Sequence, residues 1–77
     1  NKSLLVCPNP AKDSFNVYFN DFDQDATLSL SDLMGREVLC REGVRNGDTL
    51  SVKLPSGNYI VTIKNNFLSL QSKIVIL

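Results

Sequence analysis

No histidine occurs among the 77 residues, so any chemistry in this chain must come from carboxylates, two cysteines and two tyrosines. Histidine-dependent triads, Cys-His nucleophiles and the usual zinc ligand sets are therefore excluded. Asp13, Asp32 and Asp48 stand in turn-like segments, where an Asp side chain commonly bonds to the nearby backbone. A domain of this size also leaves little room for a deep pocket. We therefore predict that the chain is not an enzyme and that it uses no metal or cofactor.

An acidic run, Asp21-x-Asp23-x-Asp25, copies the first half of an EF-hand calcium loop, and Asp32 falls at the twelfth position. The likeness does not extend further. Ala26 stands where that loop requires glycine, and residues 26–31 alternate as a strand instead of opening a helix. We interpret the run as a solvated acidic loop.

The cysteines and tyrosines each have a structural interpretation beside a chemical one. Cys7 and Cys40 stand in apolar, strand-like runs, which favours two small buried side chains, with a single disulfide as the alternative. Tyr59 is interpreted as a core residue and Tyr18 as an exposed cross-strand contact. An exposed tyrosine could also stack on a sugar.

The elements that must position these residues are short strands, because apolar residues recur with period two and no stretch has helical periodicity. Seven strands are predicted, over residues 3–7, 14–19, 26–31, 37–41, 49–54, 59–64 and 68–77. The fourth is expected at an edge, because charges bracket it, and the sixth at the centre of a sheet. Turn residues separate the strands, and Asn46-Gly47 is a strong hairpin signal. The predicted fold is an all-β, seven-stranded antiparallel immunoglobulin-like β-sandwich, with a partly open barrel as the alternative.

Composition excludes several classes of partner. Eight Lys and Arg residues balance eight Asp and Glu residues, and the basic ones are scattered, so no nucleic acid or anionic membrane is expected as a partner. No uncharged apolar run approaches the roughly 20 residues that span a bilayer. The length indicates a single domain over residues 1–77. Because the chain begins with Asn1, we expect a fragment of a longer precursor whose export signal lies upstream.

Four segments occur in the order and spacing of one known family: Val6-Cys7-Pro8-Asn9-Pro10-Ala11, Leu30-Ser31-Asp32-Leu33-Met34-Gly35-Arg36-Glu37-Val38, Leu54-Pro55-Ser56-Gly57-Asn58-Tyr59-Ile60-Val61 and Ser72-Lys73-Ile74-Val75-Ile76. Together they closely resemble the C-terminal sorting domain (type A) of proteins exported by the type IX (Por) secretion system of Bacteroidetes. The resemblance covers the chain from Leu5 onward. One departure is Cys7, whose position is often aromatic in that family.

The resemblance implies a C-terminal signal domain that directs an upstream cargo in the same chain through the type IX outer-membrane translocon. It further implies transit through the periplasm, removal by a surface sortase, and release of the cargo or its anchoring to lipopolysaccharide at the cell surface. The implied partners are components of the translocon and the sortase. Recognition by them is implied for Lys73, Ile74, Val75, Ile76 and Leu77, and structural roles are implied for Pro8, Asn9, Pro10, Asp32, Gly35, Gly57 and Tyr59.

The apolar terminal strand suggests how such a signal could be read. A receptor could add its own strand beside residues 73–77, and the same edge could pair two copies into a homodimer. Two other functions fit the same fold: an immunoglobulin-like adhesive or carbohydrate-binding module, and a passive spacer or dimerisation module.

Overall fold

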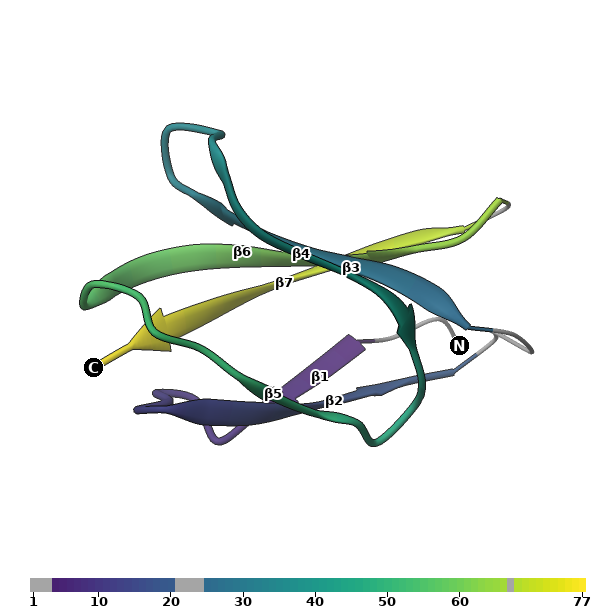
Figure 1. Ribbon diagram of the computed structural model, residues 1–77, viewed down its shortest axis with the longest axis horizontal. Coiled ribbons are helices and arrows are strands. Elements are labelled where there is room, and N and C mark those ends of the chain that lie inside the picture. The colour runs from purple at the N-terminus through teal and green to yellow at the C-terminus, as the bar shows by residue number, and fades with distance from the viewer. Residues whose placement is uncertain (1–3, 21–24, 67) are drawn as a thin grey trace.

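The computed structural model describes residues 4–20, 25–66 and 68–77, and these form two antiparallel sheets packed face to face (Figure 1). The strands are β1 (Leu4–Cys7), β2 (Ser14–Phe19), β3 (Ala26–Asp32), β4 (Glu37–Val44), β5 (Thr49–Ser51), β6 (Gly57–Lys64) and β7 (Ser69–Ile76). One sheet has the order β1-β2-β5 and the other has the order β4-β3-β6-β7. The predicted immunoglobulin-like sandwich is confirmed.

The core forms where the alternating apolar faces of both sheets meet. β2 contributes Phe15, Val17 and Phe19, β3 contributes Ala26, Leu28 and Leu30, and β6 contributes Tyr59, Val61 and Ile63; all are buried. Because successive side chains of a strand point to opposite faces, one period-two pattern decides both the strand and its buried side. The faces of β2, β3 and β6 that carry these period-two apolar residues are the buried ones, and the predicted exposure of Tyr18 is confirmed.

The predicted strand boundaries hold for β2 and change elsewhere. β4 is an edge strand as predicted, but it continues to Val44, three residues beyond the predicted end. β5 ends at Ser51, although the amide of Val52 still donates to the carbonyl of Asp13 at 2.8 Å, in register with the β2 pairing. β6 lies between β3 and β7, which confirms its central place.

The hairpin predicted at Asn46-Gly47 is wrong, although a turn is present there. β4 and β5 belong to different sheets, so this turn carries the chain from one sheet to the other. The turn bonds to β2 instead: the Gly47 amide donates to the Val17 carbonyl at 2.7 Å, and the Asn46 side-chain oxygen accepts from the Phe19 amide at 2.9 Å. A turn dipeptide therefore predicts where the chain changes direction, but it does not predict which strand will pair with the strand that follows.

The two cysteines do not form a disulfide: Cys7 is half-buried on β1, and Cys40 is exposed on β4. The interpretation of both as buried side chains is therefore wrong for Cys40, and Cys7 is only half-buried. Asp21 and Asp23 of the acidic run lie outside the described residues, as does Phe67 of the predicted connection before β7. Nowhere in the described chain does a helix occur that is long and apolar enough to cross a membrane.

Candidate functional site

The four sequence motifs meet at one end of the sandwich, which we call the motif end and define as residues 8–11, 32–36, 55–57 and 73–77. Strand register joins them directly. Asp32 pairs with Tyr59, and Tyr59 pairs with Ile74. Gly57 pairs with Ile76, which forms a parallel bridge with Ala11. In Figure 1 the corresponding connections and the C-terminus lie together at the left of the molecule.

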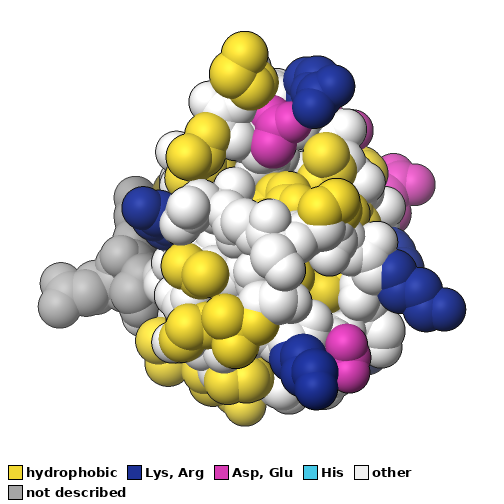
Figure 2. Space-filling model, turned by 90° about the vertical axis from the view of Figure 1, so that its left-hand side faces the viewer, with side chains coloured by type: hydrophobic (Ala, Val, Ile, Leu, Met, Phe, Trp, Pro, Cys, Tyr) yellow, Lys and Arg dark blue, Asp and Glu magenta, His cyan; other side chains and the backbone are white. Residues whose placement is uncertain are grey.

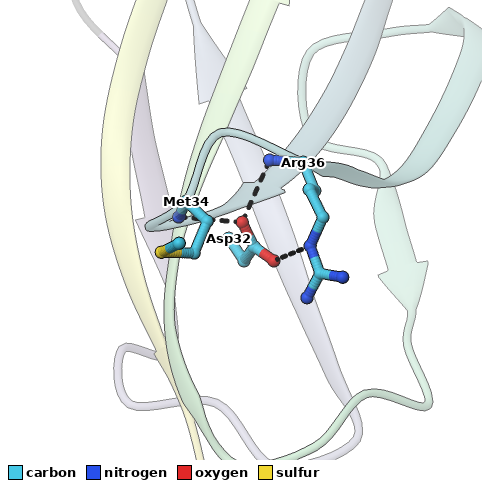
Figure 3. A network of polar contacts seen from close by, with 3 residues as sticks. All are labelled: Asp32, Met34 and Arg36. Carbon is cyan, nitrogen blue, oxygen red and sulfur yellow. Dashed lines mark hydrogen bonds and ion pairs between the residues drawn. The ribbon is translucent and has the colours of Figure 1, made fainter.

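Asp32 organises the turn between β3 and β4. One of its carboxylate oxygens accepts from the amides of Met34, at 2.9 Å, and Arg36, at 3.0 Å. The other pairs with the Arg36 guanidinium at 3.0 Å (Figure 3). Backbone bonds from Gly35 to Asp32 and from Asp32 to Arg36 close the turn. Gly35 has a φ of +87°, in the left-handed region that glycine tolerates best, so the turn predicted here is confirmed.

These contacts lower the pKa of the Asp32 carboxyl below its ordinary value. The main cause is the hydrogen bond from the Arg36 amide, which favours the charged form of the carboxylate. The hydrogen bond and charge of the Arg36 side chain and the Met34 amide act in the same direction, and partial desolvation opposes them. Asp32 thus stabilises the turn by bonding to the nearby backbone, as predicted for an Asp in a turn-like segment.

The same turn holds two large apolar side chains out in water. Leu33 is 63% exposed and Met34 is 85% exposed. Figure 2 looks onto the motif end and shows hydrophobic side chains gathered over it, with most Lys and Arg side chains at its margin. Leu77, also at this end, is 66% exposed. Turn chemistry pointed to Asp32 and Gly35 here, but no feature of the sequence indicated that the turn exposes Leu33 and Met34.

The segment Pro8-Asn9-Pro10-Ala11 covers the outer edge of β7. The Asn9 amide nitrogen donates to the Lys73 carbonyl at 3.0 Å, and its side-chain oxygen accepts from the Val75 amide at 3.0 Å. The Ala11 amide donates to the Val75 carbonyl, and the Leu77 amide donates to the Ala11 carbonyl, both at 2.8 Å. Pro8 and Pro10 flank the Asn9 side chain and are exposed.

The backbone edge of β7 is therefore occupied over residues 73–77. A receptor strand added there, or a second copy paired there, would first have to displace Asn9 and Ala11. The hypothesis of strand addition at residues 73–77 assumed a free edge, and that assumption is wrong for this fold. Asn9, a predicted structural residue, supplies the side chain that closes the edge.

The five residues of the predicted recognition segment point to two different sides. Ile74 and Ile76 are buried in the core. Lys73 and Leu77 are exposed, and Val75 is half-buried on the same outer side. In the folded chain a partner can therefore read the side chains of Lys73, Val75 and Leu77, whereas Ile74 and Ile76 hold the strand in place.

Tyr59 and Gly57 shape the start of β6. Tyr59 is buried, as predicted, and its hydroxyl donates to the Pro55 carbonyl at 2.7 Å, an arrangement like the tyrosine corner of immunoglobulin-like domains. Gly57 has a φ of +159°, which is close to extended backbone. Both residues thus support the turn that leads into the central strand.

A hollow of about 300 Å³ lies away from the motif end, lined by Leu5, Tyr18, Phe19, Asn20 and Asn46. Because Tyr59 is buried, the two tyrosines do not offer a pair of rings for a sugar. Within the described ranges, no three His, Cys, Asp or Glu side chains are placed to hold a metal ion.

Comparison with protein-family models matches residues 5–77 to the secretion system C-terminal sorting domain. A search of curated proteins gave no match. The matched range contains every residue of the motif end.

Proposed function

Since the chain belongs to the family of type IX secretion C-terminal sorting domains, we propose that its folded sandwich is the export signal, or address label, for a cargo in the same chain. The export machinery recognises the outer side of β7, by which we mean the side chains of Lys73, Val75 and Leu77. Sorting domains of this family direct export across the outer membrane to the cell surface or the medium. The label itself performs no catalysis. It is recognised by the translocon, and a surface sortase then removes it, so that the cargo is released or anchored to lipopolysaccharide.

One observation supports the outer side of β7 as the recognised surface. The strand alternates between buried Ile74 and Ile76 and the outward-facing Lys73, Val75 and Leu77. Because Asn9 and Ala11 occupy its backbone edge, side chains are what this part of the strand presents to a partner. An ammonium group in line with a half-buried and an exposed apolar side chain is a surface that a protein partner can recognise selectively.

Export of a fused reporter tests the address-label role. Residues 1–77 are joined to the C-terminus of a periplasmic reporter in a Bacteroidetes host with a type IX system, and the reporter is measured in the medium and on intact cells. We expect export with the label and none without it, or in a host that lacks the translocon. Retention of the labelled reporter in the periplasm of the competent host would contradict the role.

The mass of the exported reporter tests removal of the label. We expect a product shortened by the whole label, in the medium or attached to lipopolysaccharide. A full-length fusion on the surface would show that the label stays attached, which would overturn removal without affecting export.

A further inference from the structure

The turn between β3 and β4 exposes apolar side chains where turn chemistry favours polar ones. Asp, Asn, Ser, Gly and Pro dominate such turns, yet Leu33 and Met34 stand at its centre. They are 63% and 85% exposed, and Met34 is the most exposed of the large hydrophobic residues described. A departure from local rules of this kind is expected where a residue serves a function instead of the fold. We call Leu33 and Met34 the apolar tip.

The apolar tip is held rigidly. Its backbone is fixed by the Asp32 carboxylate, which bonds to the Met34 and Arg36 amides, and by the two backbone bonds between Asp32 and the end of the turn. In Figure 3 the Met34 side chain points away from this network. A preorganised turn loses little backbone freedom on binding, so the ordering cost of docking is confined mainly to the two side chains.

Charge decides which kind of surface the tip fits. Asp32 and Glu37 are acidic, Arg36 is basic and paired with Asp32, and the turn therefore carries a net charge of −1. A tip that inserts into an anionic membrane is instead flanked by several unpaired basic residues, whereas the motif end holds one, Lys73. The exposed Glu37 beside two apolar side chains complements a protein pocket with an apolar floor and a neutral or basic rim.

We propose that the apolar tip docks into such a pocket on a protein of the export machinery, as a second contact beside the outer side of β7. This inference rests on the proposed address-label role. Strand register brings the two contacts to the same end, since Asp32 pairs with Tyr59 and Tyr59 pairs with Ile74. A partner that covers the motif end therefore meets both.

The test compares two double variants of the labelled reporter in the type IX host. Leu33→Ser with Met34→Ser removes the tip with residues that suit a turn. Leu5→Ser with Tyr18→Ser removes two exposed apolar side chains from the other sheet, as a matched control. Far-ultraviolet circular dichroism and thermal melting of the purified chains establish that both variants fold. We expect export to fall at least about tenfold for the tip variant, because two apolar side chains lose their pocket, and to stay within about twofold of the unaltered label for the control.

Each outcome is decisive. If the unaltered label is exported and the folded tip variant is exported equally well, the tip has no docking role, while the address-label role stands. If the unaltered label is not exported, the address-label role itself fails. Tip-dependent binding of the purified chain to phosphatidylglycerol vesicles would identify a lipid surface and overturn the protein pocket. Tip-dependent dimerisation in sedimentation experiments would identify a second copy and overturn it as well.

Discussion

Asp32 has a structural role, and no catalytic one is needed to account for its place in the segment from Leu30 to Val38. Its oxygens satisfy two backbone amides and one guanidinium in the turn that it begins. All three contacts favour the charged carboxylate, whose pKa is therefore lowered. The residue is needed so that Leu33 and Met34 keep a fixed position, and its chemistry is complete within the turn.

The lowered pKa of Asp32 predicts how the turn responds to acid. When the pKa of a carboxyl is lower in the folded state than in the unfolded state, its charged form stabilises the fold. This stabilisation is fully present at a pH above the unfolded-state pKa, about 3.9 for Asp, and is lost as the pH falls through the folded-state pKa. We expect the Asp32 carboxyl, followed by NMR, to titrate below the ordinary Asp range. The chemical shifts of the Met34 and Arg36 amides should change over the same pH range. In the Asp32→Asn variant this pH-dependent change should be absent. An Asp32 carboxyl that titrates at the ordinary pKa of Asp would contradict the claim that its charged form is stabilised by Met34 and Arg36.

The Tyr59 hydroxyl predicts a measurable stability difference between the two tyrosines. Tyr59→Phe removes the donor of the part-buried hydrogen bond to the Pro55 carbonyl. We expect the free energy of unfolding in urea to fall by about 1–2 kcal/mol. Tyr18→Phe, on the exposed face, should change it by less than about 0.5 kcal/mol. Equal effects of the two substitutions would show that the bond to Pro55 contributes nothing.

The burial of individual residues was largely predictable, and their distant polar partners were not. The inward positions of Phe15, Leu28 and Val61 follow from period-two alternation, which is a local property of the sequence. The bond from Asn9 to Val75 joins residues 66 positions apart, so no local pattern indicates it. Cys40 was misassigned for a related reason: an apolar run on an edge strand does not show which of its faces is covered.

The two edge strands of the larger sheet are protected by different means. β4 carries Glu37, Arg41 and Glu42, and its pairing with β3 has two register shifts, both of which discourage pairing with another chain. β7 has no comparable charge at its end. There the segment from Asn9 to Ala11 takes up the outward backbone groups instead. The apolar terminal strand is thus less open to edge pairing than its sequence indicates.

Asn9→Ala tests this covering of β7. The substitution removes both side-chain bonds and leaves the bonds of Ala11 in place. We expect faster hydrogen exchange at the Val75 amide and a loss of about 1 kcal/mol in the free energy of unfolding. Asn58→Ala, at an exposed position of β6 opposite Val75, is the control and should leave that amide unchanged. Unaltered exchange at Val75 in the Asn9 variant would show that the edge is not closed by Asn9.

The error at Asn46-Gly47 has a clear origin at the level of the elements. The dipeptide does turn the chain, but the partners of its amide and side-chain oxygen lie on β2. Strand order depends on which sheet buries each apolar face, and that choice involves the whole core. Turn chemistry therefore predicts where strands end more reliably than which strands pair.

The whole molecule is asymmetric, because the motif end gathers all four family segments from both sheets (Figure 1). Sequence similarity indicated the four segments, and the fold brings them to one end of the molecule. Asn9 and Ala11 fix the last strand, Asp32 fixes the neighbouring turn, and Tyr59 joins the two through the sheet. The outer side of β7 and the apolar tip are two exposed parts of this arrangement.

Deleting residues 73–77 would not test recognition, because it would also remove Ile74 and Ile76 from the core. Loss of either large side chain alone would cost roughly 2–4 kcal/mol. A deletion that prevents export would therefore be explained equally well by unfolding. A test of the proposed recognition therefore has to alter only the outward-facing side chains of this segment, Lys73, Val75 and Leu77.

The most direct measurement is export of a reporter carrying the label with Lys73→Glu, Val75→Ser and Leu77→Ser, which alter the outer side of β7 and leave Ile74 and Ile76 in place. Val38→Ser with Arg41→Glu, at exposed positions of β4, provides the matched control. Circular dichroism and melting curves establish that both labels remain folded. We predict that the control label is exported like the unaltered one, and that the β7 variant accumulates in the periplasm although it is folded. Normal export of the folded β7 variant would contradict the central claim that the outer side of the terminal strand carries the message.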